Sequence, residues 1–196
     1  MRKHPDPSRS GLPVSFEPLE SRQLFAAGGP VTPPQTVPIT RVKLVLEGTT
    51  RTDNIALDVK KGYLHFYLNG VTVRYNAARV GIVQLYALNG NDTVKIGDGM
   101  MSGVYIDGGG HNDTIVGGKF NDTIIGGAGN DTISGGDGDD FLDGGKGRDD
   151  IRGGAGQDMI ISSDLELDVV DGGDDYDTAS LDLQDLFSAV ERRLYP

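Results

Sequence analysis

The stretch Gly108–Ile161 decides how this chain folds, because it reads, in blocks of nine, GGGHNDTIV, GGKFNDTII, GGAGNDTIS, GGDGDDFLD, GGKGRDDIR and GGAGQDMII. Each block opens with two glycines. The sixth position is always aspartate: Asp113, Asp122, Asp131, Asp140, Asp149 and Asp158. The eighth position is always aliphatic: Ile115, Ile124, Ile133, Leu142, Ile151 and Ile160. A short repeat of fixed period indicates a solenoid to which each block adds the same unit.

The nine positions divide into a turn and a strand. Glycine tolerates positive φ and lets the backbone approach a bound ion, so the first six positions predict a turn. The last three positions predict a very short strand, in which only the eighth side chain points inward. The aliphatic eighth positions therefore predict a thin apolar core. A flexible Gly/Asp-rich linker is the alternative, but six copies in one frame argue against it.

Two blocks are expected to form one full coil, so alternate turns fall on opposite edges. One edge would carry Asp113, Asp131 and Asp149, and the other Asp122, Asp140 and Asp158. Neighbouring coils lie about 4.8 Å apart, so these carboxylates repel one another unless a cation lies between them. Calcium suits such a gap because it takes about 6–8 oxygen ligands, whereas magnesium demands a smaller octahedron. The lack of cysteine and the scarcity of histidine argue against zinc or copper.

This arrangement resembles the repeats-in-toxin family of haemolysin-type calcium-binding proteins, closely over residues 108–161 and more loosely over residues 88–180. The resemblance implies an all-β fold, a parallel β-roll, in which sixth-position aspartates and turn carbonyl groups hold calcium ions between turns two repeats apart. Carried onto this chain, it frames four sites, between Asp113 and Asp131, Asp131 and Asp149, Asp122 and Asp140, and Asp140 and Asp158.

The same resemblance implies which turn glycines surround the ions. They are Gly108, Gly110, Gly117, Gly126, Gly129, Gly135, Gly138, Gly144, Gly147, Gly153 and Gly156. His111 and Phe120 replace the fourth-position glycine in the first two repeats, so those turns are expected to bind more weakly or to adopt a different backbone.

The acidity of the chain is concentrated in the repeats. The 196-residue chain has a formal net charge of −11, and residues 107–177 hold 18 acidic residues against 4 basic ones. Regular spacing favours a cation site over a solvated acidic face or a disordered tail. The sign of the charge disfavours nucleic acid as a partner. No apolar run approaches the roughly 20 residues of a membrane span.

Residues 1–37 are predicted to be a disordered export or sorting segment and linker, because prolines interrupt most of the stretch. Within it, the segment FEPLESRQLFAA at residues 16–27 resembles the N-terminal motif of exported planctomycete surface proteins. Ser15 would cap a short helix there. An incidental short helix is the alternative to an export signal. Ala26-Ala27-Gly28 is a plausible processing point, and an extracellular or cell-surface location would follow.

Residues 38–106 are predicted to form a β region that feeds the roll and seals its edge. Strands are expected over residues 42–46, 54–59, 63–68, 71–75 and 80–88, with a hairpin turn at Asn69-Gly70. Asn89–Val94 is similar to a degenerate first repeat with Asp92 at the sixth position, and Asp53 has a weaker version of the same setting. The step from Asp92 to Asp113 is longer than the regular one, so a loop is expected at residues 97–103.

After Ile161 the frame is expected to slip, because residues 162–171 contain no glycine pair. Gly172–Asp177 restores the turn, which makes Asp177 a further candidate ligand, with Ala179 and Leu181 continuing the inward column. The roll is therefore placed at residues 107–180 and a C-terminal cap at residues 181–196. Apolar residues expected in the core of this cap are Leu183, Leu186, Phe187 and Val190; a partner-binding helix is the alternative.

The outward seventh and ninth positions differ between the two faces. On one sheet they are mostly polar: Thr114, Val116, Thr132, Ser134, Asp150 and Arg152. On the other sheet they are more apolar: Thr123, Ile125, Phe141, Asp143, Met159 and Ile161. An apolar patch often marks a contact, so this face is expected to be covered by the C-terminal segment or by another molecule. Scattered apolar surface residues are the alternative.

The sequence offers no catalytic constellation. There is no HExxH motif and no cysteine, and His4, His65 and His111 are isolated. The interpretation is a non-enzymatic calcium-binding module of an exported or surface protein, whose folding depends on calcium. Two other classes stay open: an adhesion or matrix protein that binds polysaccharide or a protein partner through the apolar sheet, and a polysaccharide-active enzyme or its accessory domain that uses residues 38–106.

Overall fold

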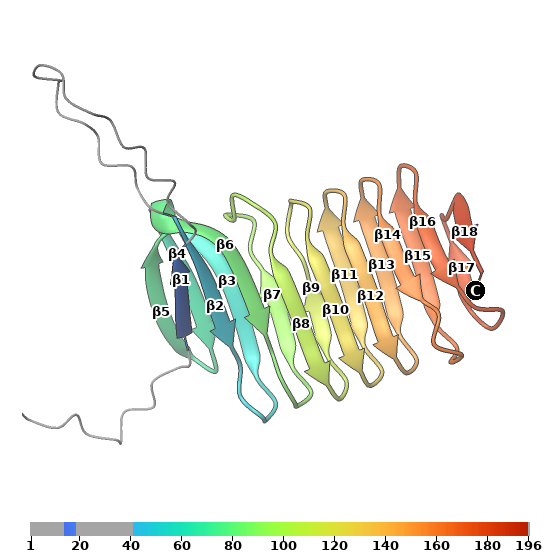
Figure 1. Cartoon of the computed structure of the whole chain (residues 1–196), viewed down its shortest axis with the longest axis horizontal. Helices are drawn as coiled ribbons and strands as arrows, with labels where there is room; N and C mark the ends of the chain where they lie inside the picture. Colours follow the sequence, from blue (N-terminus) through green and yellow to red (C-terminus); the bar gives the residue numbers. More distant parts are fainter. Residues whose placement is uncertain (1–13, 19–40, 196) are drawn as a thin grey trace, which may run out of the picture.

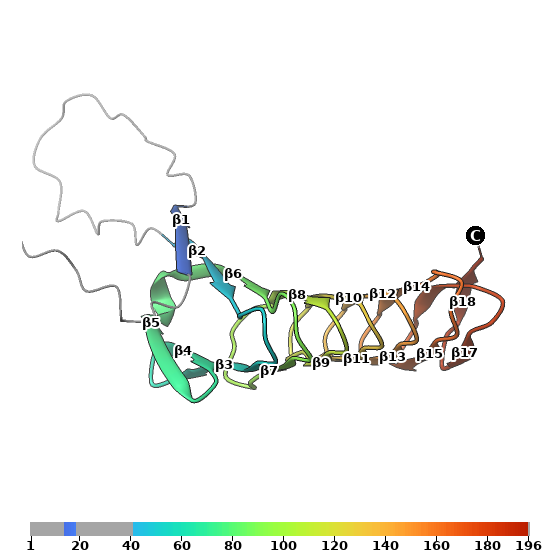
Figure 2. The same cartoon turned by 90° about the horizontal axis from the view of Figure 1, so that it is seen from below.

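The chain folds as a two-sheet solenoid in which nearly every element is a β-strand (Figure 1). The computed structural model describes residues 14–18 and 41–195, with side chains from residue 41 onward. Figure 2 shows the two sheets as facing layers joined by turns. The predicted parallel β-roll is therefore confirmed. No helix in the described part of the chain is both long and apolar enough to cross a membrane.

Successive strands alternate between the two sheets through the repeats. Sheet A contains, in spatial order, β1 (Val14–Pro18), β2 (Val42–Glu47), β6 (Val80–Tyr86), β8 (Tyr105–Gly110), β10 (Thr123–Ala128), β12 (Phe141–Lys146), β14 (Met159–Ser162), β16 (Thr178–Leu181) and β18 (Arg192–Leu194). Sheet B contains β17 (Leu186–Ser188), β15 (Val169–Asp174), β13 (Asp150–Ala155), β11 (Thr132–Asp137), β9 (Thr114–Val116), β7 (Thr93–Ile96), β3 (Asn54–Lys60), β4 (Tyr63–Leu68) and β5 (Val71–Asn76). A 3₁₀ turn, η1 (Ala77–Arg79), joins β5 to β6.

Neighbouring coils pair in parallel with a step of two repeats. Ile124 of β10 lies opposite Leu142 of β12, and the same register holds throughout the repeats. Most repeat strands are six residues long, so the predicted three-residue strand is wrong. The strands are longer because the glycine pair of the next block stays in the ladder, as Gly127 does opposite Gly145.

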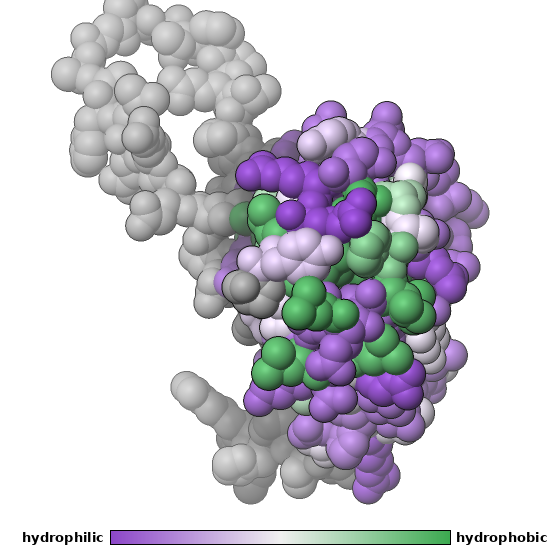
Figure 3. Space-filling model, turned by 90° about the vertical axis from the view of Figure 1, so that its right-hand side faces the viewer, coloured by the Kyte–Doolittle hydropathy of each residue, from purple (hydrophilic) through white to green (hydrophobic). Residues whose placement is uncertain are grey.

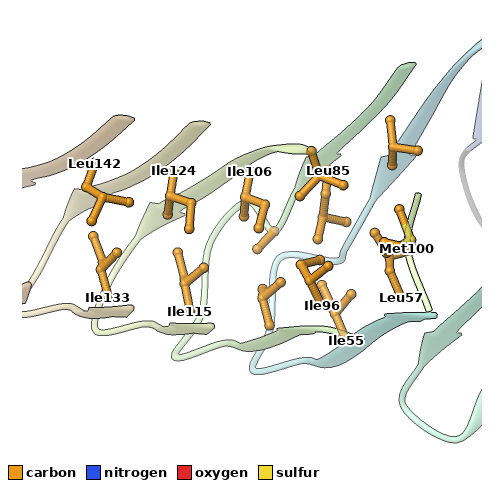
Figure 4. Packing of buried hydrophobic residues seen from close by; sticks show 14 of the residues in the cluster. Ile55, Leu57, Leu85, Ile96, Met100, Ile106, Ile115, Ile124, Ile133 and Leu142 are labelled. Atoms are coloured by element: carbon orange, nitrogen blue, oxygen red, sulfur yellow. The ribbon is translucent and has the colours of Figure 1, made fainter. Parts of the chain in front are cut away.

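One aliphatic side chain per strand fills the space between the sheets. Ile124 and Leu142 of sheet A face Ile115 and Ile133 of sheet B in two opposed rows (Figure 4). All four are fully buried. The inward eighth position is thus confirmed, and the core of the repeats is only two side chains deep.

The N-terminal region follows the predicted strands closely. Strands β3, β4 and β5 form an antiparallel meander that ends sheet B. Asn69 and Gly70 at the β4–β5 turn have φ of 49° and 83°, as the hairpin signal predicts. The expected loop at residues 97–103 is present, and the Gly99 N–H donates to Asp58 Oδ1 at 3.2 Å. At this end sheet B bends away from sheet A (Figure 2).

Strand β1 corrects one prediction for the N-terminal segment. Ser15 does not cap a helix, because Val14–Pro18 pairs antiparallel with β2, with Ser15 opposite Val45. The extended strand is favoured over a helix because β2 presents an open sheet edge to which a strand can add. The predicted export motif at residues 16–27 otherwise lies outside the described residues, as does the processing point.

The C-terminal segment, predicted to form a cap, adds one strand to each sheet of the solenoid. Strand β17 extends sheet B and β18 extends sheet A. Val190 is buried as predicted, but Leu183 is 93% exposed, Leu186 59% and Phe187 38%, so the predicted core packing of these three is wrong. They lie on the last coil, where no further coil covers them. Figure 3 looks at this end of the molecule and shows apolar side chains gathered among polar ones.

The outward positions of the two sheets alternate with the buried column as predicted. The C-terminal segment does not cover the more apolar face of sheet A, because β18 lies in the plane of that sheet beside β16. Met159 on this face is 52% exposed. That part of the prediction is therefore wrong, and a covering partner molecule stays a proposal.

Candidate metal centre

Aspartate side chains form a continuous ladder along one edge of the solenoid. Its members are Asp53, Asp92, Asp113, Asp131, Asp149, Asp168 and Asp185. The Oδ1 atom of each aspartate accepts a hydrogen bond from the backbone N–H of the preceding member. For example, the Asp113 N–H donates to Asp131 Oδ1 at 2.8 Å. Each carboxylate is thereby held in the gap between two turns.

A second ladder follows the opposite edge. Its members are Asp122, Asp140, Asp158, Asp177 and Glu191. The Val104 N–H begins it by donating to Asp122 Oδ1 at 2.8 Å, and Glu191 Oε2 ends it by accepting from the Asp177 N–H at 2.7 Å. The predicted separation of alternate aspartates onto two edges is therefore confirmed. The structure also aligns Asp92 and Asp177 with their columns, as the sequence predicts.

In the described part of the chain, the second carboxylate oxygen has no hydrogen-bond partner in most of the ladder aspartates. In seven aspartates Oδ2 is buried and accepts no hydrogen bond within the described residues: Asp92, Asp113, Asp131, Asp140, Asp149, Asp158 and Asp177. These side chains are at most 3% exposed. A buried charged oxygen without a partner is strongly unfavourable, so native proteins pair it with a donor or a metal ion.

The first glycine of each repeat makes room for these oxygens. A Cβ atom on Gly126 would lie 2.6 Å from Asp131 Oδ2 and 2.5 Å from the carbonyl oxygen of Gly144. A Cβ atom on Gly108 would meet Asp113 Oδ2 and the Gly126 carbonyl oxygen in the same way. A side chain would therefore fill a space that is lined by one carboxylate oxygen and one carbonyl oxygen of the next turn on that edge.

The same pairing of a carboxylate with a carbonyl recurs along the second edge. A Cβ on Gly135 would meet Asp140 and the Gly153 carbonyl oxygen, and one on Gly153 would meet Asp158 and the Gly172 carbonyl oxygen. No three acidic or histidine side chains in the described ranges converge on one point. A cation here would therefore take part of its ligand set from turn carbonyls. Mixed carboxylate and carbonyl oxygens are the donor set of calcium, so the residues fit that ion.

Without a cation, the ladders are held under electrostatic strain. Burial raises the pKa of Asp113, Asp140 and Asp149 to about 7 and that of Asp158 to about 6, from an ordinary value of 3.8. Desolvation of the carboxylate is the largest cause of each raised pKa, and neighbouring carboxylates on the same ladder add to it. The backbone N–H bond to each Oδ1 lowers these pKa values, but it does not offset the burial.

The two turns that lack the fourth-position glycine behave differently. His111 keeps the left-handed backbone of its column, with a φ of 75°, like Gly129 with a φ of 138°. Phe120 does not have positive φ, and its turn differs. There the Gly118 N–H donates to Asp122 Oδ2 at 2.7 Å, so Asp122 is absent from the set of unpaired oxygens. The expected change of backbone is confirmed at Phe120 and wrong at His111.

The members at both ends of the first ladder also have both oxygens paired. Asp53 accepts hydrogen bonds from the Thr49 N–H and from Asn69 Nδ2. Asp168 Oδ2 accepts from the Ser162 hydroxyl at 2.6 Å. Asp185 Oδ2 accepts from the Asp182 N–H at 2.8 Å. At these positions the protein supplies the donors, and no space for an additional ligand is implied.

The sequence interpretation missed Asp168 and Asp185. The signal is present, because Asp168-Val-Val-Asp-Gly-Gly173 matches Asp140-Phe-Leu-Asp-Gly-Gly145. The frame slip hid it: the step from Asp149 to Asp168 is one residue longer than the regular step, yet the ladder is unbroken. One extra residue in the 162–167 turn accounts for the difference.

The sequence interpretation also missed a short ladder of asparagine side chains at the fifth position of the repeat. Asn91 Oδ1 accepts from the Asn112 N–H at 3.2 Å, Asn112 Oδ1 from the Asn130 N–H at 2.9 Å, and Asn130 Oδ1 from the Arg148 N–H at 3.0 Å. The recurrence of asparagine before the invariant aspartate is its signal in the sequence. These bonds fix the spacing of successive turns next to the aspartate ladder.

Comparison with known families agrees with this geometry. Residues 107–142 and residues 125–160 each match the model of the RTX calcium-binding nonapeptide repeat, which spans four copies. This chain therefore carries RTX calcium-binding nonapeptide repeats, a family of repeats that binds Ca²⁺. No curated protein matches the chain.

Proposed function

We propose that this chain is a non-enzymatic calcium-binding module whose ions lie between alternate turns of the two aspartate ladders. One observation carries the proposal: seven buried carboxylate oxygens have no donor within the described residues, and they recur at regular intervals along both edges. Each calcium ion would replace the missing hydrogen bond and neutralise the repulsion along the ladder.

The ligands can be named from the spaces beside the first glycines. On the first edge, Asp113 and Asp131 with the carbonyl groups of Gly126 and Gly144 would hold ions. On the second edge, Asp140, Asp158 and Asp177 lie beside the carbonyl groups of Gly153, Gly172 and Ala189. Of the four sites framed by sequence, the one between Asp122 and Asp140 is the weakest, because Gly118 already occupies Asp122 Oδ2.

Folding of the roll would depend on calcium. The repeats bury only two facing rows of aliphatic side chains, which is little apolar area to set against the entropy of ordering about seventy residues. The buried carboxylates oppose folding further while they are ionised and unpaired. An ion that binds only the folded roll stabilises it by mass action, as metals do in other small metal-dependent domains.

Export of the chain is part of the same proposal. Low calcium inside a cell would leave the repeats loosely folded, and extracellular calcium would fold them. Extracellular calcium modules bind at about 10⁻⁴–10⁻³ M, so their occupancy follows the surrounding calcium concentration. The resemblance of residues 16–27 to an export motif supports an extracellular or surface location.

Calorimetric titration of the chelator-treated full chain tests binding, with magnesium as the matched control. We expect saturable calcium binding to several sites and much weaker magnesium binding, because the wide mixed-oxygen gaps suit the larger ion. Circular dichroism during the same titration tests the coupling to folding. No saturable calcium binding would refute the proposal, whereas full β-sheet signal in excess chelator would refute only the coupling.

A further inference from the structure

The outer face of sheet A carries a stripe of aromatic and acceptor side chains that the calcium ladders do not use. It runs across β6, β8, β10 and β12, and consists of Gln84, Tyr86, Tyr105, Asp107, Ile125, Phe141 and Asp143. The parallel register places these residues in two adjoining columns, because Gln84 lies opposite Tyr105 and Tyr86 opposite Asp107. The columns continue across β10 to Phe141 and Asp143. We call this set the sheet A stripe.

The rings of the stripe are fixed in place by their neighbours. The Tyr86 and Tyr105 rings lie 5.7 Å apart with an interplanar angle of 50°. The Tyr86 hydroxyl donates to Gln84 Oε1 at 3.3 Å. Tyr86, Tyr105 and Phe141 are each half-buried, so part of each side chain is open to solvent. Rigid rings offer contact area at little cost in side-chain entropy.

Two carboxylates are interleaved with the rings. Asp107 and Asp143 point outward on either side of Ile125 in the same column. Both are half-buried, and burial raises the pKa of each. The stripe therefore offers hydrogen-bond acceptors set among apolar surfaces, which is the pattern of a ligand site more than of a solvated face.

The charge of this face restricts what can bind it. In the two columns of the stripe, none of the residues of β6, β8, β10, β12 and β14 is lysine or arginine, and the exposed Lys146 lies at the turn end of β12. A polyanion would meet Asp107 and Asp143 without a balancing cation, so nucleic acid and sulfated or uronic polymers are disfavoured. An uncharged partner rich in hydroxyl groups complements a surface of flat rings and acceptors. The opposite face on sheet B differs, because Lys95 and Arg152 lie among its outward residues.

We propose that the sheet A stripe binds an uncharged polysaccharide that lies across the strands. Tyr86, Tyr105 and Phe141 would contact the flat apolar faces of sugar rings. Asp107, Asp143 and Gln84 would accept hydrogen bonds from sugar hydroxyl groups. This rests on the proposed function only because calcium must hold the strands in register for the rings to align.

Co-sedimentation and affinity electrophoresis of the full chain in saturating calcium test the proposal. The probes are cellulose, insoluble β-1,3-glucan and soluble dextran, with dextran sulfate as the polyanionic comparison. We expect retention by at least one neutral glucan and no stronger retention by dextran sulfate. The double variant Tyr86→Ala/Tyr105→Ala should weaken that retention by about tenfold or more.

The matched control is Thr114→Ala/Thr132→Ala, which removes two outward side chains of sheet B and should leave retention unchanged. Asp143→Asn, which keeps the shape of the stripe, gives a second reading if the tyrosine variant folds poorly; it should weaken retention without altering calcium-driven folding. Lack of retention by every neutral glucan, or equal retention of the tyrosine and threonine variants, would overturn the proposal. Calorimetric calcium binding of each variant separates this failure from a failure of the calcium site.

Discussion

Aspartates in the middle of the first ladder and near its C-terminal end are equally buried but differ in the hydrogen bonding of Oδ2. Asp131 in the middle is 2% exposed and Asp168 near the end is 1% exposed, so burial does not distinguish them. In both, Oδ1 accepts a backbone N–H. Asp168 Oδ2 accepts the Ser162 hydroxyl, whereas Asp131 Oδ2 has no donor in the described structure.

This difference indicates where the solenoid relies on an ion and where it relies on its own donors. At both ends of the first edge, protein donors pair the carboxylate oxygens of Asp53, Asp168 and Asp185. On the second edge, Asp177 Oδ2 near the C-terminal end still has no donor in the described structure. In the middle, each Oδ2 lies beside the first glycine of its repeat, where a Cβ atom would meet both this oxygen and, in most repeats, a carbonyl oxygen of the next turn. A bridging cation would satisfy these oxygens while they are ionised, whereas a proton would do so at lower pH.

The largest effect is expected when the charge of a middle aspartate is removed. Asp131→Asn keeps the Oδ1 acceptor but replaces Oδ2 with an amide, so calcium affinity should fall by about tenfold or more, because ligand charge sets affinity. The calcium-free protein should become more stable, because a buried unpaired charge is lost. Calorimetry and urea unfolding measure the two changes.

Asp168→Asn is the matched control at the end of the ladder. Its amide can still pair with Asp149 and with the Ser162 hydroxyl, so calcium affinity should change little. Equal losses of affinity in Asp131→Asn and Asp168→Asn would contradict the distinction between middle and end.

The next largest effect is expected in the pH dependence of the stability of the calcium-free protein. The pKa of Asp113, Asp140 and Asp149 is raised from 3.8 to about 7 on folding, so the folded state holds more protons than the unfolded state between these values. Stability should therefore be greatest below pH 4 as far as these groups are concerned, and should fall as pH rises through 7. Urea midpoints in chelator at pH 5 and pH 8 test this.

Calcium should reverse that trend, because the ion competes with protons for the same oxygens. Affinity should rise between pH 5 and pH 8, with protons released on binding. An unfolding midpoint in chelator that rises with pH over this range would show that the middle carboxylates are not buried and unpaired.

A smaller effect is expected when an aspartate near the end of the ladder loses the donor to its Oδ2. Ser162→Ala removes the donor to Asp168 Oδ2 and should destabilise the protein by about 1–3 kcal/mol, the usual cost of a buried acceptor left unpaired. Ser134→Ala, on the outer face of sheet B, is the matched control and should be close to neutral. Thermal unfolding in saturating calcium compares them, and equal stability of the two variants would argue against a structural role for Ser162.

The smallest effect is expected at the turn of Asp122. Phe120→Gly permits the left-handed backbone used by the other turns, so it should free Asp122 Oδ2 from Gly118 and strengthen calcium binding on the second edge. His111→Gly should leave the number of bound ions unchanged, because His111 already has that backbone. Calorimetric stoichiometry distinguishes them, and an identical response of both variants would contradict this interpretation.

The nonapeptide frame predicts the fold and the two edges because the sequence period coincides with the burial pattern. In every repeat the eighth residue points inward, as Ile133 does, and the sixth residue ends a turn, as Asp131 does. Asp168 and Asp185 escape the frame because the step from Asp149 to Asp168 is 19 residues and the step from Asp168 to Asp185 is 17, yet both stay in the ladder. Which oxygens are bare cannot be predicted from the repeat alone. That depends on single donors such as Ser162, and on the backbone that Phe120 imposes at its turn.

Hydrogen exchange by mass spectrometry, with and without calcium, tests the central claim most directly at pH 8. In excess chelator we predict rapid exchange of the amides of residues 108–177, while the β3–β4 meander stays more protected because of its larger core. Saturating calcium should slow exchange in the repeats strongly, first around Asp131 and Asp140. Equal protection of the repeats in chelator and in calcium would show that the bare carboxylate oxygens do not need an ion.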